Sequence, residues 1–504
     1  QFIEVVSHQQ NLEETSMKKN FLTAAALTVV AFFVATEIAQ AADVTFSGQV
    51  RSRWEYNEHT TAANNSTRKF LNDVDGDDFI ATRVRLNANV NVNDSTSAFI
   101  QMQSIRTWGQ DLNTANAGTG GGSGNASFSP SDADASVGLH QAYFTLKNFA
   151  TLPVDLKLGR QQIVLDGHRL LGHTGWTTGA QTHDGLTMSH KHGNHTLTYA
   201  YILANEDDRG DTTADANDID VHLAHANFQG ILGGNLSIYG IALLDDCGLT
   251  TSTACNINAA DNNIYTVGFR QAGQLFGIDY RGEYYYQGGE ANSDALRNAG
   301  GSTGSLTNGQ LDYNSAGGDI LNTDRDAYMF GVRIGKKFNN VAMKPSLTIW
   351  YDQLSGTDDD DLKGGDYGTF NTLFDTGHKF YGHMDLFLNN INHGTQGLGL
   401  TDLAVKASLQ PMPGWTVKFA WHKFKTEVDP SDNPFARSNN LAATVDDDLG
   451  TEVDLALIHK YNANTVISAG YSVFSADTLF NLQSTGTSVA NSADWAYVSF
   501  DVKF

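Results

Sequence analysis

Several residue types are scarce in this sequence, and each scarcity limits what the protein can be. Only 2 of the 504 residues are cysteines. After residue 41, no apolar run reaches the roughly 20 residues that a transmembrane helix requires. Basic residues are outnumbered, because 32 Lys and Arg stand against 56 Asp and Glu. The resulting formal net charge of −24 argues against nucleic acid as a partner.

The two cysteines, Cys247 and Cys255, lie close together in the stretch D-C-G-L-T-T-S-T-A-C. Their spacing fits neither a C-x-x-C redox motif nor a C-x-x-C-H haem site. In an exported protein, a lone close pair predicts a small disulfide loop, and two free thiols are the alternative.

The N-terminal region predicts export. Residues 17–41 begin with Met-Lys-Lys, continue through an apolar run and end on Ala-Gln-Ala, which is the pattern of a secretory signal peptide. Residues 1–16 are then an upstream extension, and residues 42–504 form the mature chain. No change of composition divides the mature chain, so we expect a single domain.

The mature chain alternates apolar and polar residues with a period of two, which indicates β-strands with one apolar face. In the stretch A-T-R-V-R-L-N-A-N-V-N-V, for example, Val84 and Leu86 occupy one face, and Arg83 and Arg85 occupy the other. Many such segments are as long as transmembrane strands must be, and several carry charges in succession on the polar face. This pattern is typical of strands that face lipid outside and water inside.

Short and long connections alternate between these segments, as periplasmic turns and extracellular loops do in outer-membrane barrels. The short connections are V-N-D-S-T, K-H-G-N-H, Q-A-G-Q, Q-P-M-P-G and Y-N-A-N-T, and the long ones span 57–78, 109–136, 205–218, 245–261, 288–325, 427–448 and 475–493. The alternation assigns the run H-K-F-Y-G-H-M-D-L-F to one long outer connection, 355–400, which we expect to fold over or into the barrel.

The fold class follows from these two patterns. We predict an all-β fold, a transmembrane antiparallel β-barrel of about eighteen strands with short periplasmic turns and long extracellular loops. The chain ends on an apolar residue, Phe504, at the end of an alternating strand. Such a strand would be an exposed edge unless it pairs with the first strand near Val44, so we expect the barrel to close there.

Four stretches resemble the alginate-export family of Gram-negative outer-membrane barrels: L-K-L-G-R-Q-Q-I-V-L-D-G-H-R-L-L-G, W-T-T-G-A-Q-T-H-D-G-L-T-M-S, F-N-T-L-F-D-T-G-H-K-F-Y-G-H-M-D-L-F and L-G-T-E-V-D-L-A-L-I-H-K-Y. The resemblance covers nearly all of the mature chain. It implies a monomeric eighteen-stranded barrel, integral to the outer membrane and in contact with its lipid and lipopolysaccharide. It also implies passive passage of solutes and no enzymatic reaction; the best-known members export an anionic polyuronate through a basic pore.

The polar strand faces supply candidate residues for the solute path, and basic residues predominate among them. Arginine suits carboxylate solutes because its planar fork binds both oxygens. The resemblance adds Arg160, Arg169 and Lys379 at a constriction, although simple counting puts Arg160 on the lipid side unless a bulge or an early strand end intervenes. The full set of candidates is Arg51, Arg53, Arg83, Arg85, Arg160, Arg169, Arg270, Arg281, Arg333, Lys379, Lys418, Glu452 and Asp454. The alternative role for each is to brace the barrel wall.

We therefore expect a passive channel for polar, anionic solutes, with uronate-type saccharides as a specific candidate. The alternative is a surface interaction or calcium-binding barrel that acts through its acidic loops. We expect no cofactor. Asp73, Asp75 and Asp77 flank a turn glycine and resemble a calcium loop, so Ca²⁺ bound in the outer loops is the alternative.

Overall fold

The computed structural model describes residues 43–58, 76–108, 137–205, 218–246, 262–291, 323–387, 395, 397–432, 446–477, 479–480 and 491–504. Contacts divide the chain into two units, Gln1–Asp43 and Val44–Phe504, and the strands of the sheet belong to the second. The predicted signal peptide and upstream extension lie outside the described residues, and the division of the chain at residue 41 stays a prediction.

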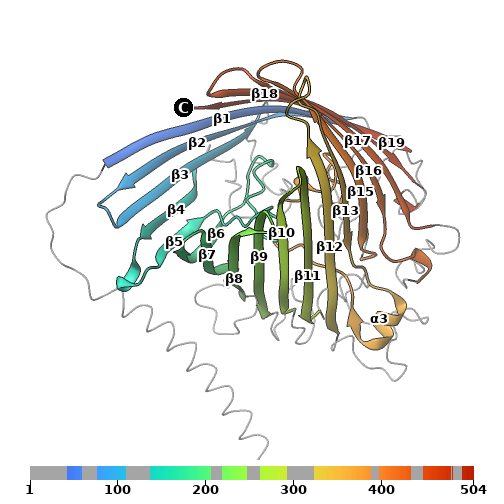
Figure 1. Cartoon of the computed structure of the whole chain (residues 1–504), viewed down its shortest axis with the longest axis horizontal. Helices are drawn as coiled ribbons and strands as arrows, with labels where there is room; N and C mark the ends of the chain where they lie inside the picture. Colours follow the sequence, from blue (N-terminus) through green and yellow to red (C-terminus); the bar gives the residue numbers. More distant parts are fainter. Residues whose placement is uncertain are drawn as a thin grey trace, which may run out of the picture. The chain divides into compact units, whose positions relative to one another are not determined.

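In the described part of the second unit, nearly all of the regular secondary structure is β-strand (Figure 1). In chain order they are β1 (Asp43–Asn57), β2 (Asp77–Asn91), β3 (Thr96–Thr107), β4 (Gly138–Leu146), β5 (Asp155–Gln161), β6 (His183–His192), β7 (His195–Asn205), β8 (Asp218–Ile231), β9 (Gly234–Asp246), β10 (Ile264–Leu275), β11 (Ile278–Glu290), β12 (Asp324–Lys337), β13 (Ser346–Leu354), β14 (Asp366–Tyr367), β15 (Leu400–Leu409), β16 (Trp415–Lys425), β17 (Asp448–Lys460), β18 (Thr465–Ala476) and β19 (Ser492–Lys503).

Helix is confined to short pieces in the part of the chain that the structure describes. They are η2 (Phe149–Thr151), α3 (Asp359–Gly364), η3 (Gly377–Lys379) and η4 (Pro430–Asp432), together with the helical residues Leu479 and Phe480. Among the described residues, no helix is long and apolar enough to span a membrane.

The strands form one closed antiparallel barrel. Each long strand pairs with its sequence neighbour, and β19 pairs with β1 in a register that joins Gln49 to Lys503 and Asn57 to Trp495. The two-residue β14 is the exception, since it pairs in parallel with β12 while β13 pairs directly with β15. Within the described residues the wall therefore has eighteen strands, and the predicted closure of the last strand on the first is confirmed.

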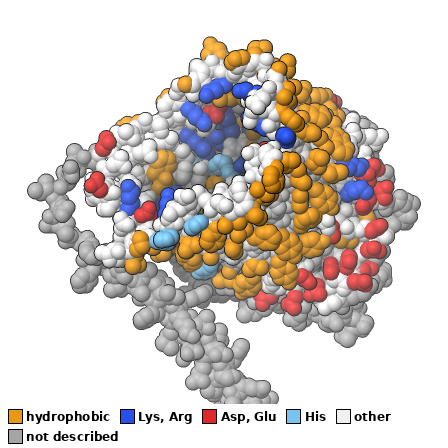
Figure 2. Space-filling view, viewed as in Figure 1, with side chains coloured by type: hydrophobic (Ala, Val, Ile, Leu, Met, Phe, Trp, Pro, Cys, Tyr) orange, Lys and Arg blue, Asp and Glu red, His pale blue; other side chains and the backbone are white. Residues whose placement is uncertain are grey.

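The barrel buries its polar face and exposes its apolar face, the reverse of a soluble protein. On β17, Glu452 and Asp454 are buried in the interior, whereas Val453 and Leu455 are 40% and 50% exposed on the outside. A continuous band of hydrophobic side chains covers much of the outer surface in Figure 2. Because water would penalise such a band, this surface is suited to lipid, as the alternating sequence predicts.

Four of the five predicted short turns lie where the sequence places them, and the fifth is wrong. β10 continues through Q-A-G-Q, and the chain reverses at Phe276 and Gly277, which have φ values of 52° and 74°. Two consecutive positive φ values make the two-residue turn that best joins twisted antiparallel strands. Gly273 instead allows β9 and β10 to approach closely, since a Cβ at this position would lie 2.7 Å from the Cα of Gly234 on β9.

Candidate functional site

Two connections fold into the barrel and meet there. We call residues 162–182, between β5 and β6, the first inward segment, and residues 368–387, from the long connection after β13, the second inward segment. The amide of Phe374 donates to the carbonyl of Leu170 at 2.9 Å, and the amide of Gly172 donates to the carbonyl of Phe374 at 2.8 Å. These bonds make a short parallel bridge, so the two segments form one inner structure.

The second inward segment packs into the barrel through its aromatic residues. Phe380, Tyr381 and Phe387 are each 1% exposed and belong to one hydrophobic cluster with wall residues such as Trp350 and Phe424. The Phe387 and Phe424 rings lie 4.6 Å apart. The sequence predicts that the connection 355–400 folds over or into the barrel, and residues 368–387 of this connection fold into it.

Arginines of β1 and β2 hold the first inward segment by its backbone. Arg51 donates to the carbonyls of Gly175 and Thr177 at 2.9 and 3.0 Å, and Arg53 donates to that of Trp176 at 2.7 Å. Arg83 reaches the carbonyls of Gly175 and Thr177 at 3.3 and 3.1 Å. These arginines therefore anchor the inner structure. Carbonyl oxygens carry only partial charge, so these bonds do not cancel the charges of Arg51 and Arg83, whereas Arg53 is paired with Glu55 at 2.6 Å.

A buried charge cluster fixes the place where the two inward segments meet the opposite wall. Arg169, fully buried, bonds Glu283 at 3.1 Å, Asp352 at 2.5 Å and the Tyr381 hydroxyl at 2.7 Å. Arg333 lies 3.6 Å from both carboxylates. Two further wall arginines, Arg270 and Arg281, each approach Glu283 at 3.9 Å. The basic residues of this cluster are thus paired with acids.

A second set of buried acids receives the backbone of the second inward segment. Glu452 accepts hydrogen bonds from the amides of His383 and Met384 at 2.6 and 2.9 Å. Asp454 lies 3.8 Å from the His383 ring and 3.9 Å from His422. Of the two roles that the sequence left open for Glu452 and Asp454, these contacts support a structural one.

Two cavities lie beside the inner structure on the side of the short turns. The larger, about 720 Å³, is lined by six basic side chains and a single acidic one: Arg51, Arg53, Arg83, Arg85, Lys379 and Lys503, with Asp501. The smaller, about 550 Å³, is lined by Lys379, Lys406 and Lys418, with Asp454. Figure 2 shows the hollow of the barrel with Lys and Arg side chains gathered inside it.

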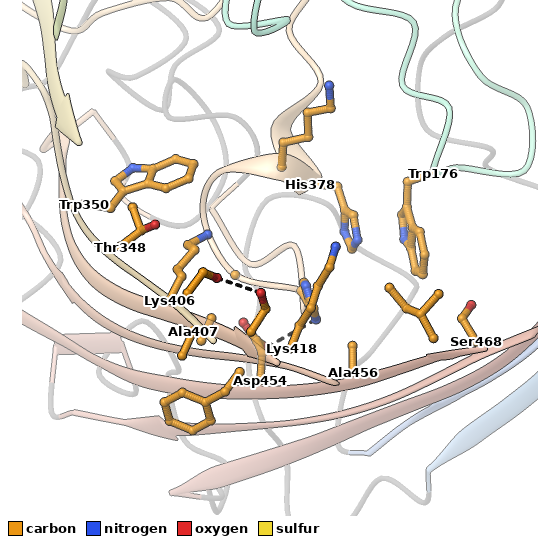
Figure 3. Close-up of a pocket in the computed structure, with 18 of the residues that line it drawn as sticks. Trp176, Thr348, Trp350, His378, Lys406, Ala407, Lys418, Asp454, Ala456 and Ser468 are labelled. Atoms are coloured by element: carbon orange, nitrogen blue, oxygen red, sulfur yellow. Dashed lines mark hydrogen bonds and ion pairs between the residues drawn. The ribbon is translucent and has the colours of Figure 1, made fainter. Parts of the chain in front are cut away.

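The two cavities share a wall built from both inward segments. Trp176 and His378 stack face to face with ring centroids 4.1 Å apart, and both cavities contact these rings and Lys379. Figure 3 shows Trp176 and His378 side by side, facing the wall residues Lys406, Lys418 and Ser468. Burial and the neighbouring Arg281 guanidinium lower the pKa of Lys379 from its ordinary value.

Burial also shifts the pKa of other titratable groups on the inward segments. It lowers the pKa of His168 and of His383 to about 4 each, so both rings are neutral near pH 7. It raises the pKa of the Asp375 carboxyl well above its usual range, against the opposing effect of Arg169. These three side chains are therefore mainly uncharged near pH 7. The charged side chains of the inner structure are those with an ion-pair partner, such as Arg169, or those that line a cavity, such as Lys379.

Most of the predicted solute-path residues face the interior, with one exception. The interior residues are Arg51, Arg53, Arg83, Arg85, Arg169, Arg270, Arg281, Arg333, Lys379, Lys418, Glu452 and Asp454. Arg160 lies instead on the outward parity of β5, opposite Ala142 and Asp184, and it pairs with Asp184. The bulge that would turn it inward is absent from this strand, since the register of β5 is unbroken from Leu156 to Arg160.

Two other predictions fall mostly outside the described residues. Cys247 and Cys255, Asp73 and Asp75 belong to connections that the structure does not describe, so the disulfide and the calcium loop stay predictions. Asp77 is the exposed first residue of β2. Among the described residues, no group of three or more His, Cys, Asp or Glu is arranged to hold a metal ion.

Several residues of the site were not singled out from the sequence. Trp176 and His378 form the shared cavity wall, and Asp166 ties the first inward segment to the barrel by accepting bonds from His225 at 3.1 Å and from the Tyr239 hydroxyl. The sequence offered one sign of these residues, which is their position in the chain. All three lie in connections that lack the period-two pattern but carry aromatic and apolar residues, as inward-folded connections would.

The family comparison decides where this chain belongs. Residues 43–488 match the model of the family described as "Alginate export". The chain is a member of the alginate export family. This assignment agrees with the resemblance that the four sequence stretches carry, and with the strand number. The family and the closed barrel together indicate an integral outer-membrane protein with the fold of a porin-like channel.

Solved structures of Occ-family outer-membrane porins share this fold. Pseudomonas aeruginosa OccK8 (OprE) is 11% identical, with a TM-score of 0.52, over 92% of this chain and 98% of its own. Acinetobacter baumannii OccAB1 is 12% identical, with a TM-score of 0.51, over 93% and 99%. P. aeruginosa OccK2 (OpdF), solved in complex with glucuronate, is 11% identical, with a TM-score of 0.50, over 92% and 98%. A comparison with curated proteins finds no match.

Proposed function

We propose that this alginate-export-family member is a passive outer-membrane channel for small polar anions, with uronate-type saccharides as a specific candidate. The observation that carries the proposal is the larger cavity, which six basic side chains and one acidic side chain line. Among the described residues, Arg51, Arg83, Arg85 and Lys379 have no carboxylate partner in an ion pair. Their positive charge is therefore available to a solute.

The net charge of the chain makes this asymmetry informative. The chain as a whole carries −24, yet the larger cavity has an excess of positive charge. A cleft lined by one sign of charge between low-dielectric walls focuses the field and concentrates the opposite ion. Arginine pairs with carboxylates through two parallel bonds, which favours organic anions over spherical ions.

One solved structure with the same fold suggests which solute to test. OccK2, which shares the fold, is described in complex with glucuronate, a sugar carboxylate. At 11% identity this likeness concerns the fold alone, so the uronate assignment for the present chain depends on the basic residues of its own cavity.

The remaining parts of the proposal follow from the family and the fold. We propose that the barrel is monomeric, that its apolar band contacts outer-membrane lipid and lipopolysaccharide, and that it catalyses no reaction. The alternative function, through acidic loops that bind a partner or Ca²⁺, stays a prediction, because those loops lie largely outside the described residues.

The proposed function is tested by the swelling of liposomes that contain the purified barrel. Glucose, glucuronate and glucosamine have similar size and differ in charge. The proposal predicts that glucuronate enters fastest and glucosamine slowest. Faster entry of glucosamine than of glucuronate would overturn it, and liposomes without protein provide the background.

A further inference from the structure

The two cavities differ in the number of cations that a solute could use. In the larger cavity, Arg83 and Arg85 lie beside Arg51, and their guanidinium groups have no carboxylate partner among the described residues. In the smaller cavity, Lys406 lies 4.1 Å from the Trp350 ring centroid and donates weakly to the Phe380 carbonyl at 3.5 Å. Lys418 has no such contact in the described part of the chain, and it faces the cavity in Figure 3.

The cavities are adjacent and joined through one cation. Lys379 lines both, and the stacked rings of Trp176 and His378 form the rest of the shared wall together with Val466 and Ser468. A solute that lies along this shared surface would extend from one cavity into the other. Lys379 would then be near its middle, and a separate basic group would lie at each end, on the arginine side and on the Lys418 side. An anion with a single carboxylate would use only one of those ends.

We propose that the two cavities form one binding site for a small dianion, with one carboxylate on the Arg83–Arg85 side and the other on Lys418. This inference deepens the proposed function and depends on it. The stacked rings of Trp176 and His378 contact the carbon chain of the solute. Lys418 binds the second carboxylate, so it makes the site prefer a dianion to an anion with one carboxylate. Asp454 limits the site, because it places one negative charge in the smaller cavity.

The test compares glucarate, which has a carboxylate at each end of a six-carbon chain, with glucuronate, which has one. Both are added to the two sides of a planar bilayer that holds the full barrel in KCl, and the concentration that halves the single-channel current is measured. In the wild type we expect glucarate to block at a roughly tenfold lower concentration, the effect of one additional charge-assisted contact.

The matched variants are Lys418→Gln and Lys460→Gln. Lys460 is an exposed lysine at the end of β17, beside a short turn, and lines neither cavity. We expect Lys418→Gln to raise the half-blocking concentration of glucarate roughly tenfold, with little change for glucuronate, and Lys460→Gln to change neither. Heat-dependent gel mobility shows that each variant has formed the barrel.

Two results would overturn the dianion site: equal block by the two acids in the wild type, or equal effects of the two substitutions. Either could occur in a channel that still prefers anions, and then the proposed function would stand. A wild-type channel that prefers potassium to chloride would instead refute the proposed function itself, so the two failures are distinguishable.

Discussion

The substitution Arg51→Ala should loosen the first inward segment without opening the barrel wall. Arg51 is 8% exposed and donates two hydrogen bonds, at 2.9 and 3.0 Å, to the carbonyls of Gly175 and Thr177. A hydrogen bond from a charged donor contributes about 1.5–3 kcal/mol, and the remaining arginines retain part of the anchoring. We therefore estimate a loss of about 2 kcal/mol in the local stability of residues 174–179.

Hydrogen exchange of the folded barrel in detergent measures this loss directly. A local opening that becomes easier by about 2 kcal/mol exchanges roughly thirtyfold faster. Peptides that cover residues 174–179 should show the change, and peptides from β17 and β18 should not. The matched control is Lys337→Ala, because Lys337 is an exposed residue at the end of β12 that has no described contact with the segment.

The same variant separates the two roles of the basic wall. If Arg51 anchors the segment, exchange accelerates and the single-channel current becomes noisier as the segment moves in the lumen. Unchanged exchange in residues 174–179, together with an altered ion preference, would contradict the anchoring role and leave Arg51 as a pore charge alone.

Three further predictions concern the anchor of the second inward segment, its pH dependence and one hairpin. Glu452→Ala removes the acceptor of two amide hydrogen bonds, and exchange at His383 should accelerate about tenfold or more; unchanged exchange would refute the anchor. Burial lowers the pKa of His168 and His383 to about 4, below the unfolded value of 6.5, so the inward segments should be fully stable above pH 6.5 and loosen as the pH falls toward 4. Protection factors at pH 7 and 5, corrected for the pH dependence of intrinsic amide exchange, measure this, and equal or lower protection at pH 7 would contradict it. Gly277→Val should lower barrel stability by about 1–2 kcal/mol in thermal gel-shift assays, because the φ of 74° at Gly277 strains a residue that has a Cβ. Gly282→Val is the control, since a Cβ there meets equally open space, and it should cost less; equal losses of stability would show that backbone strain is not the cause.

The barrel wall was predictable from the sequence because each strand carries its own pattern. On β17, the alternation of Glu452 and Asp454 with Val453 and Leu455 assigns every side chain to a face, and one-residue slips would place carboxylates in lipid. The prediction of a turn at Q-A-G-Q was wrong, because the sequence alone does not distinguish a glycine within a strand from a glycine in a turn. Gly273 allows close strand approach, and the turn is made by Gly277.

The interior was predictable only as a set of residue types. The sequence placed basic residues on the inner face, but it did not reveal that Arg51 and Arg53 would bond backbone carbonyls more than a hundred positions away. Nor did it predict the first inward segment, because an inward-folded connection has no periodicity of its own. Arg160 shows the same limit, since its place depends on whether the β5 register is broken, and the register is regular.

The central claim, that the interior selects anions, is tested most directly by reversal potentials of the wild-type channel across a KCl gradient. The basic cavity predicts preference for chloride over potassium at low salt, which should fade as the Debye length falls from about 30 Å at 0.01 M to about 3 Å at 1 M. Arg83→Glu with Arg85→Glu should weaken or reverse that preference. Preference of the wild type for potassium at low salt would contradict the account.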